Sequence, residues 1–390
     1  MRLRIVPVFA ILALFMAQPL LLAATTYRYA AICDGRVCLV ASGGRTRLVL
    51  AEWSNDGCWQ GVAVSPKSGT IVSSLCPDAG YYAAKLYRVG PRTKARRLIP
   101  GGTGFHLPEC PVWLNDNVLL LEKINKEGMG AGIWALNIRT GSSKLVVPPL
   151  PDNEFFYDSL MPSPSGRRLL TTLGITAGSW LSVNDVTRGK SLWRTNPDEG
   201  MVGFGGVAWS ADDRWLYVAF YRDDEMASSS PGGVWRFDSR NGKQYLWKYA
   251  KQSIDGVWSL PRLGNLIVQR GSHIECIRQS DGAKLFELPI TKIGGVVGCF
   301  GTGNHLLVCG SESVLETTLS GKTVRARRVG RLSADVVRYS STRDAIMYGA
   351  TRSDGQGDNQ TGVLDLRTGR VTKFGADDWW VEWLGHDIVR

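Results

Sequence analysis

The stretch from Gly206 to Trp247, GVAWSADDRWLYVAFYRDDEMASSSPGGVWRFDSRNGKQYLW, contains one complete copy of a unit that recurs along the chain. In its first half, apolar residues alternate with their neighbours, which is the period of a β-strand. Ala211-Asp212-Asp213 interrupts the alternation as a turn, and Asn241-Gly242 is a hairpin-turn signal. The unit therefore predicts four antiparallel strands in a meander, the form of one β-propeller blade.

Eight segments resemble the first strand of this unit and begin about 39 to 50 residues apart, the spacing of one four-stranded blade per repeat. They are Gly61–Ser65, Cys110–Leu114, Ser159–Ser163, Gly206–Ser210, Gly256–Leu260, Val296–Phe300, Val336–Ser340 and Trp380–Leu384. Because the eighth lies near the C-terminus, its blade needs three more strands. The N-terminal runs Tyr27–Cys33, Arg36–Ala41 and Thr46–Leu50 alternate in the same way but have no first strand before them.

Joining the C-terminal strand to the three N-terminal runs completes a blade and removes exposed sheet edges around the ring. We therefore predict an all-β fold, a single β-propeller over residues 25–390 with eight four-stranded blades. Seven blades are the alternative, because the units that begin near Gly256 and Val296 are short and irregular.

The turns after three of the first strands, Val64–Gly69, Pro162–Gly166 and Trp209–Asp213, resemble the W-S-P-D-G turn of WD40-like propellers of the TolB type. The resemblance spans essentially the whole chain after residue 24 and implies an architecture more than a function. Asp185–Trp193 resembles a repeat of quinoprotein-like propellers, a family for which eight blades are typical. The chain lacks the adjacent cysteine pair of quinoprotein alcohol dehydrogenases, so this second resemblance implies blade geometry more than a redox cofactor.

Three predicted third strands end in a short polar residue that precedes a glycine by four positions. The pairs are Asn137 with Gly141, Asp238 with Gly242 and Asp365 with Gly369. Such a glycine supplies the positive φ that a tight turn needs, and the polar side chain can satisfy local backbone groups. The pattern predicts tight turns between the third and fourth strands.

The N-terminus begins with Met1-Arg-Leu-Arg4 and continues as an apolar run to Ala24, which predicts a secretory signal peptide over residues 1–24. We expect cleavage near Ala23 or Ala24. The alternative is an uncleaved membrane anchor, which Pro7 and Pro19 disfavour. No cysteine lies at the exit, so we expect an exported protein, periplasmic or extracellular, that is not a lipoprotein.

Eight cysteines follow the signal segment, and an exported protein is in a compartment where disulfides form. Cys58 and Cys76 lie equally far from Lys67, the centre of a predicted hairpin turn, which makes them the first candidate pair. Cys33 and Cys38 flank a short turn and form the second. Buried thiols that act as small hydrophobic residues are the alternative.

The chain has 46 basic and 35 acidic residues, a net charge of +11, with basic clusters at Lys94–Arg97, Arg167-Arg168 and Arg325–Arg328. Two of these clusters fall on predicted fourth strands, where positive charge discourages edge-to-edge pairing. Their functional interpretation is attraction to an anionic envelope surface or an acidic partner. Nucleic acid is not expected as a partner of an exported chain.

The sequence predicts no catalytic residues and no metal site built on histidine. The four histidines fall in separate predicted blades: His106, His273, His305 and His386. Asp354 and Asp358 lie in a loop whose carboxylates are spaced to wrap a calcium ion, but Asn359 occupies the position that needs glycine. A solvated hairpin loop is therefore favoured there, and calcium is the one cofactor that the sequence leaves open.

Two features are candidates for a partner-binding site. Asp223, Asp224 and Glu225 begin an acidic loop that the other repeats do not share. Trp379 and Trp380 are consecutive in a strand, so one of them faces a loop or rim, where it binds a partner or locks the ring.

We predict a monomeric, exported scaffold that recognises a protein or peptide partner through loops on one face. One alternative is a propeller enzyme, a lyase or hydrolase, with a polar site at the central channel. The other is a quinoprotein-like assembly scaffold.

Overall fold

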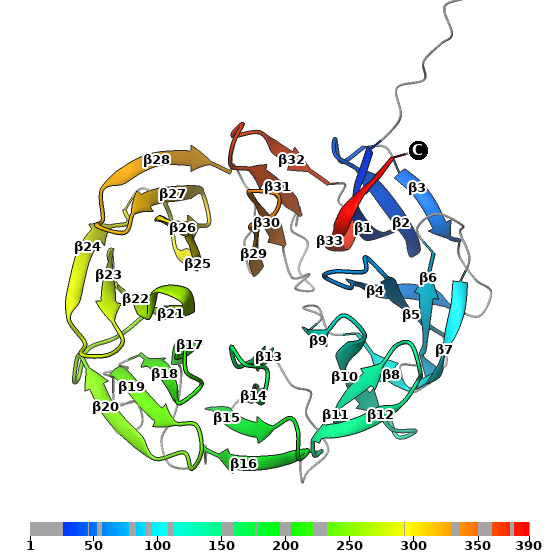
Figure 1. Ribbon diagram of the computed structural model, residues 1–390, viewed down its shortest axis with the longest axis horizontal. Helices are drawn as coiled ribbons and strands as arrows, with labels where there is room; N and C mark the ends of the chain where they lie inside the picture. The colour runs from blue at the N-terminus through cyan, green and yellow to red at the C-terminus, as the bar shows by residue number, and fades with distance from the viewer. Residues whose placement is uncertain are drawn as a thin grey trace, which may run out of the picture.

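The computed structural model describes residues 26–45, 47–52, 57–77, 83–90, 96–107, 112–149, 159–175, 178–195, 204–221, 232–291, 293–329, 336–349, 361–374 and 378–389. Eight antiparallel blades form a closed ring (Figure 1). The predicted eight-bladed propeller is thus confirmed, and the seven-bladed alternative is wrong. The fold is that of a WD40-like propeller, and a 3-10 turn, η3 (Pro261–Leu263), lies between the first and second strands of one blade.

The first strands of the blades lie nearest the centre of the ring (Figure 1). From blade 1 to blade 8 they are β4 (Cys58–Val64), β9 (Val112–Asn115), β13 (Ser159–Pro162), β17 (Phe204–Trp209), β21 (Gly256–Leu260), β25 (Val296–Thr302), β29 (Val336–Ser340) and β33 (Asp378–Val389). In blade 2 a short strand, β8 (Phe105–His106), pairs with the second strand beside β9. The second strands are β5 (Ile71–Cys76), β10 (Val118–Ile124), β14 (Arg168–Ile175), β18 (Trp215–Phe220), β22 (Asn265–Arg270), β26 (His305–Gly310), β30 (Ala345–Gly349) and β1 (Thr26–Cys33).

The third and fourth strands complete each blade toward the outside of the ring. The third strands are β6 (Lys85–Val89), β11 (Gly130–Asn137), β15 (Gly178–Asp185), β19 (Gly233–Asp238), β23 (His273–Arg278), β27 (Ser313–Thr318), β31 (Gly362–Asp365) and β2 (Arg36–Ala41). The fourth strands are β7 (Arg96–Thr103), β12 (Ser143–Val147), β16 (Lys190–Arg194), β20 (Gln244–Lys248), β24 (Lys284–Pro289), β28 (Thr323–Arg328), β32 (Val371–Lys373) and β3 (Arg47–Ala51).

The ring is closed by β33, which pairs with β1 in a sheet of order β3-β2-β1-β33, as the sequence predicts. Arg338 on β29 forms an ion pair with Glu382 on β33, so the first strands of blades 7 and 8 are also linked by charge. Burial raises the pKa of Glu382, and the Arg338 guanidinium opposes this shift.

The hydrophobic core lies between the blades. Each of eight clusters of buried apolar side chains combines residues of two adjacent blades, so every seam of the ring has its own core. Trp209, for example, is 3% exposed at the seam of blades 3 and 4, and its indole N–H donates to the Met161 carbonyl at 3.1 Å. Trp209 therefore has a structural role in the packing of blade 4 against blade 3.

The predicted tight turns are present after the third strands. Gly242 has φ +72°, a left-handed conformation that disfavours other residues, and Asp238 Oδ1 accepts the Arg240 N–H at 2.9 Å. Asn137 and Asp365 accept backbone N–H groups in the same way. The repeated polar residue therefore has a structural role in each turn.

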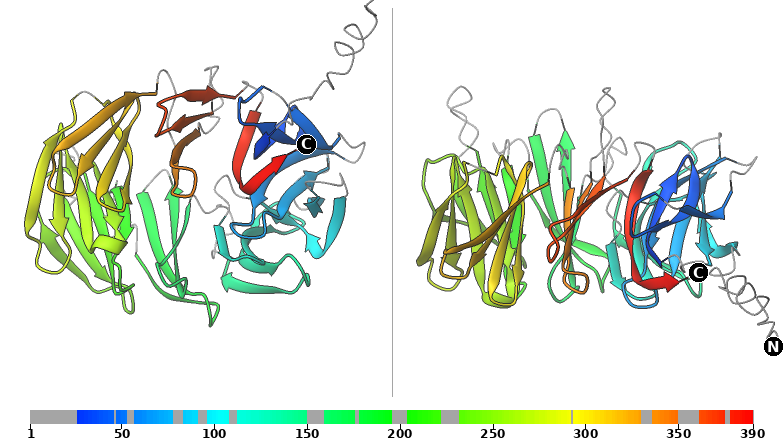
Figure 2. Two further views of the ribbon diagram at one scale, coloured as in Figure 1. Left: turned by 45° about the horizontal axis from the view of Figure 1, so that its top comes forward. Right: turned by 90° about the horizontal axis from the view of Figure 1, so that it is seen from above.

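Antiparallel order gives the ring two different faces (Figure 2). Turns from first to second and from third to fourth strands lie on one, here called the turn face. Connections from second to third strands, and from each blade to the next, lie on the other, here called the loop face. All of the longest connections are on the loop face, including those from β18 to β19 and from β30 to β31.

Aspartate side chains form hydrogen bonds between neighbouring blades on the turn face. Asp116 in blade 2 accepts hydrogen bonds from Ser65 Oγ and from the Ser68 N–H of blade 1, at 2.8 Å for the latter. Asp213 in blade 4 accepts from Ser163 Oγ at 2.8 Å and from the Ser165 N–H at 3.1 Å in blade 3. These bonds fix adjacent blades against each other at their turns.

Asp213→Ala should lower the free energy of unfolding by about 2 kcal/mol, because it removes charge-assisted hydrogen bonds and places alanine at a left-handed φ. Asp213 has φ +60°. Asp213→Gly removes the same bonds without backbone strain, so it should cost about 1 kcal/mol less in urea unfolding. Equal losses in the two variants would show that strain plays no part.

The predicted disulfides are absent from the described cysteines. The register places Cys58 opposite Cys76, which confirms the predicted hairpin, but no disulfide joins the two sulfurs. The second prediction also misjudged the register, since Cys33 lies opposite Arg36 and Cys38 lies opposite Ala31. Cys33 and Cys38 are buried in the core of the seam between blades 7 and 8. Cys110 lies outside the described residues.

Candidate functional site

The junction of blades 4 and 5 on the loop face combines the predicted acidic loop with a buried charged network. Here β20 is joined to β21 by the connector Tyr249–Asp255, and β18 is joined to β19 by the chain segment that contains the acidic loop. The connector is bonded to both ends of that segment: the Gly233 N–H donates to Gln252 O at 2.6 Å, and the Ile254 N–H donates to Phe220 O at 3.1 Å.

The connector has an unusual backbone. Tyr249 and Lys251 both have φ +58°, which side-chain-bearing residues adopt rarely. A short turn results, in which the Gln252 N–H donates to Tyr249 O at 3.1 Å. Strained conformations of this kind persist where surrounding contacts hold them. The contacts that hold this one are made by Tyr249 and Gln252.

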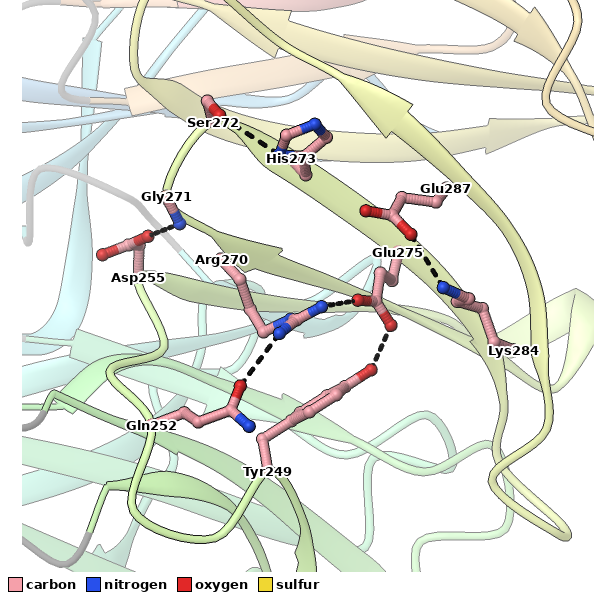
Figure 3. Close-up of polar contacts among 10 residues, drawn as sticks. All are labelled: Tyr249, Gln252, Asp255, Arg270, Gly271, Ser272, His273, Glu275, Lys284 and Glu287. Atoms are coloured by element: carbon pink, nitrogen blue, oxygen red, sulfur yellow. Dashed lines mark hydrogen bonds and ion pairs between the residues drawn. The ribbon is translucent and has the colours of Figure 1, made fainter.

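Glu275, on β23, is the centre of the network and is 2% exposed. Its carboxylate accepts one hydrogen bond from the Arg270 guanidinium and another from the Tyr249 hydroxyl (Figure 3). Arg270 also donates to Gln252 Oε1 at 2.8 Å, and its guanidinium carbon lies 4.6 Å from the centre of the Tyr249 ring. The buried charge is therefore paired, which burial of a carboxylate requires.

Polar pairs surround this centre on blade 5 (Figure 3). Asp255 accepts the Gly271 N–H at 2.5 Å, which ties the connector to the turn between β22 and β23. Ser272 Oγ lies 3.1 Å from His273 Nδ1, and Lys284 forms an ion pair with Glu287 at 2.7 Å. The bond from Lys284 lowers the pKa of Glu287.

The chemistry of the centre favours positioning over catalysis. Glu275 already accepts from two donors, and burial, then the bond to Glu275, raises the pKa of Tyr249 far above its ordinary value. Tyr249 is therefore not poised to transfer a proton near neutral pH. Among the described residues, no group of three or more His, Cys, Asp and Glu side chains is arranged to hold a metal ion.

A pocket of about 190 Å³ between blades 7 and 8 brings together Arg28, Arg343, Arg370 and Asp365 on the turn face. Asp365 accepts the backbone N–H groups of Arg367 and Thr368, so its carboxylate holds its own turn. The described residues that line the pocket include no second carboxylate and no histidine or cysteine. This pocket therefore supplies no acid–base pair for the enzymatic alternative.

The structure describes only some of the site residues that the sequence predicts. Asp223, Asp224 and Glu225 lie outside the described residues, as do Asp354 and Asp358 of the calcium candidate. Tyr221, just before the acidic loop, is 41% exposed, and its pKa is raised by burial and by the Asp255 carboxylate.

Trp379 and Trp380 belong to β33, and the Trp379 backbone lies opposite Ile32 of β1. Their stretch therefore forms the ring closure. Of the four histidines, His273 lies on blade 5 and His305 on blade 6, where His305 Nδ1 lies 3.0 Å from Glu316.

Sequence reasoning missed Tyr249, Arg270 and Glu275. One signal was available: Glu275 is a charged residue within the strand His-Ile-Glu-Cys-Ile-Arg, whose central residues are otherwise apolar. A carboxylate in such a run is buried only with partners. The identity of those partners depends on the connector from blade 4.

Comparisons with known proteins reveal similarity of fold only. No family model matches the sequence, and no curated protein does. Saccharomyces cerevisiae Sqt1 is similar in structure, with a TM-score of 0.54, 9% identity and coverage of 94% of this chain and 93% of that one.

A eukaryotic initiation factor has a TM-score of 0.52, 11% identity and coverage of 93% and 98% of the two chains. BamB from Moraxella catarrhalis has a TM-score of 0.45, 13% identity and coverage of 84% of this chain and 96% of that one. No helix in the described part of the chain is long and apolar enough to cross a membrane.

Proposed function

We propose that this chain is an exported scaffold protein that binds a protein or peptide partner through its loop face, centred on the junction of blades 4 and 5. The observation that carries the proposal is the difference between the two faces. Short turns on the turn face bond to one another, whereas the longest connections all emerge on the loop face. Segments of this kind, held by a rigid scaffold, are where binding residues concentrate.

The charged network supports this position for the site. It holds the connector, and the connector in turn bonds to both ends of the acidic loop segment. Gln252 O accepts the Gly233 N–H at one end, and the Ile254 N–H donates to Phe220 O at the other. Fixed ends reduce the conformational entropy that a loop loses when it binds. The junction therefore presents the acidic residues from a pre-organised base.

The structural neighbours contribute the fold and no more, because propellers with one architecture serve many functions. Export is supported by the N-terminal sequence, with its basic start, apolar run and small-residue exit. N-terminal sequencing of the protein recovered from its native cells should find a start near Thr25. A mature protein that retains Met1 and remains inside the cell would contradict export.

Photocrosslinking in the native cells tests the binding face. A benzoylphenylalanine at Tyr221 on the loop face should give a discrete crosslinked product, because this side chain lies beside the proposed site. The same probe at Lys322, in an exposed turn on the turn face, should not give that product. Changing Asp223, Asp224 and Glu225 together to alanine should reduce the product formed from Tyr221.

Two outcomes count against the proposed face. The same product from both probe positions would show contact without a preferred face. A yield from Tyr221 that the triple alanine variant leaves unchanged would show that the acidic loop does not contribute. Circular dichroism of each variant establishes that the propeller is folded before either comparison is made.

A further inference from the structure

Blade 4 has a second surface, at the opposite end from the proposed loop-face site. Three cationic side chains and two aromatic rings alternate across its second, third and fourth strands near the turn face. The residues of this basic-aromatic stripe are Arg214, Trp215, Arg236, Tyr245 and Lys243. Tyr245 is 38% exposed, and Arg214 and Lys243 are also exposed.

The rings hold Arg236 in place. Its guanidinium carbon lies 4.6 Å from the centre of the Trp215 ring and 5.8 Å from that of Tyr245, and the two rings meet edge to face at 6.0 Å. Arg214 lies 4.8 Å from the Trp215 ring, and Lys243 lies 5.5 Å from the Tyr245 ring. Cation–π contacts orient these cations without neutralising their charge.

Arg236 has unused hydrogen-bonding capacity. Within the described part of the chain it forms no ion pair, and its buried Nε has no acceptor. The nearby carboxylates already serve their own turns: Asp212 accepts from Ser210 Oγ at 2.6 Å, and Asp238 accepts the Arg240 N–H. A half-buried guanidinium with free donors is unfavourable unless an acceptor reaches it.

Blade 6 shows what fills the same position elsewhere in the ring. Arg236 lies opposite Tyr217 in blade 4, and the register of blade 6 places Glu316 opposite Leu307 at the equivalent site. Glu316 is 7% exposed, forms an ion pair with Arg325, and lies 3.0 Å from His305 Nδ1. Blade 6 therefore contains its own carboxylate, whereas blade 4 has a cation at this position and no described carboxylate to pair with it.

A separate hollow lies on the other face of the blade 4 sheet, where Trp193 and Phe237 pack at the seam with blade 3. A pocket of about 340 Å³ lies between β16 and the turn from β19 to β20, and Lys243 is part of its lining. Arg194, Trp193, Asn241 and Gln244 also line it, which adds a fourth cation and two amides. Lys243 is the one residue that the described pocket lining shares with the stripe.

We infer that the basic-aromatic stripe is a docking surface for an acidic peptide segment of a protein partner, with a carboxylate of that segment bound by Arg236. Arginine presents a planar fork that matches a carboxylate in bidentate geometry, and the flanking rings exclude water from the pair. Arg214 and Lys243 add attraction over the length of the segment. This surface is on a different face from the proposed loop-face site, so either can fail independently of the other.

The test uses a fluorescein-labelled peptide of alternating serine and glutamate, and a matched peptide with glutamine in place of glutamate. Fluorescence anisotropy should show binding of the acidic peptide alone, weakened as salt is raised. Arg236→Gln should weaken that binding by about tenfold, because it removes a charged hydrogen-bond partner. Arg240→Gln, which removes an equal charge from an exposed position in the same turn, should weaken it by less than about twofold.

Three other results would overturn the inference. Equal weakening by Arg236→Gln and Arg240→Gln would overturn the inference, because general electrostatic attraction would then explain binding. Vesicles with anionic lipid that bind with the same dependence on Arg236, while the peptide does not bind, would overturn it in favour of a membrane surface. If Arg236→Gln does not fold, the exposed pair Arg214→Gln and Lys243→Gln replaces it, and unchanged peptide binding would then refute the docking surface.

Discussion

Glu122→Gln is expected to be more stable relative to the parent protein as pH rises, with a difference that grows by about 3 kcal/mol between pH 4.5 and pH 7. Glu122 lies on β10, 7% exposed, and its Oε1 has no hydrogen-bond partner among the described residues. Burial raises the pKa of this carboxyl to about 8. The substitution keeps the shape of the side chain and removes its ability to ionise.

The direction of this pH dependence follows from the pKa of the Glu122 carboxyl in the unfolded chain and in the folded chain. Below about pH 4.5 the carboxyl is protonated in both folded and unfolded chains, so it contributes no pH dependence. Between about pH 4.5 and pH 8 the unfolded chain loses the proton and the folded chain keeps it, so folding becomes less favourable as pH rises. Glutamine has no proton to lose, and its stability therefore lacks this decline.

Urea unfolding of both proteins at several pH values measures the difference. The adjacent Lys123 does not neutralise Glu122, since its ammonium lies over the Phe105 and Trp134 rings, at 5.5 and 4.8 Å from their centres. Glu127→Gln, in the exposed turn between β10 and β11, is the control and should preserve the parent's pH dependence. A difference that stays constant from acid to neutral pH would show that Glu122 is ionised in the folded protein.

Glu275→Gln is the second substitution with a large expected effect, a loss of about 3 kcal/mol in the free energy of unfolding. The amide cannot balance the Arg270 charge, and it accepts at one oxygen where the carboxylate accepts at two. Loosening of Tyr249 and Gln252 should also free the connector between blades 4 and 5. We therefore expect faster cleavage by trypsin at Lys251, inside the connector.

Glu287→Gln provides a matched control on the same blade. Its carboxylate pairs with Lys284 at the surface, where solvent and salt screen the interaction, so its removal should change stability little. The contrast depends on burial, because both substitutions exchange one carboxylate for an amide. Similar small losses in the two variants, with no change in cleavage at Lys251, would contradict a role for Glu275 in holding the connector.

The blade architecture was readable from sequence because it depends on local periodicity repeated many times. Gly206 to Trp247 shows alternation, turn residues and a glycine at the tight turn, and seven related segments follow the same order. The ring closure was also readable, since three N-terminal runs lacked the strand that the C-terminus supplies. Repetition compensated for the weakness of each separate signal.

The disulfide predictions failed for a reason of geometry. Sequence distance from Lys67 located the register of Cys58 and Cys76 correctly, yet register alone does not bring two sulfurs into bonding geometry. For Cys33 and Cys38, an offset of two residues between the strands places Ala31 opposite Cys38 instead.

By itself the sequence determined the class of fold and the place of closure, and it favoured eight blades over seven, because these follow from a hydrophobic pattern that recurs from blade to blade. Only the tertiary structure decided which polar groups meet. Glu275 lies on β23 of blade 5 and Tyr249 lies in the connector that leaves blade 4, and they share a bond because blade 5 packs on this connector. Arg236 and Glu316 occupy equivalent strand positions in blades 4 and 6. Glu316 pairs with Arg325, whereas Arg236 lies against aromatic rings, because the side chains that meet at a seam depend on both of the blades that form it.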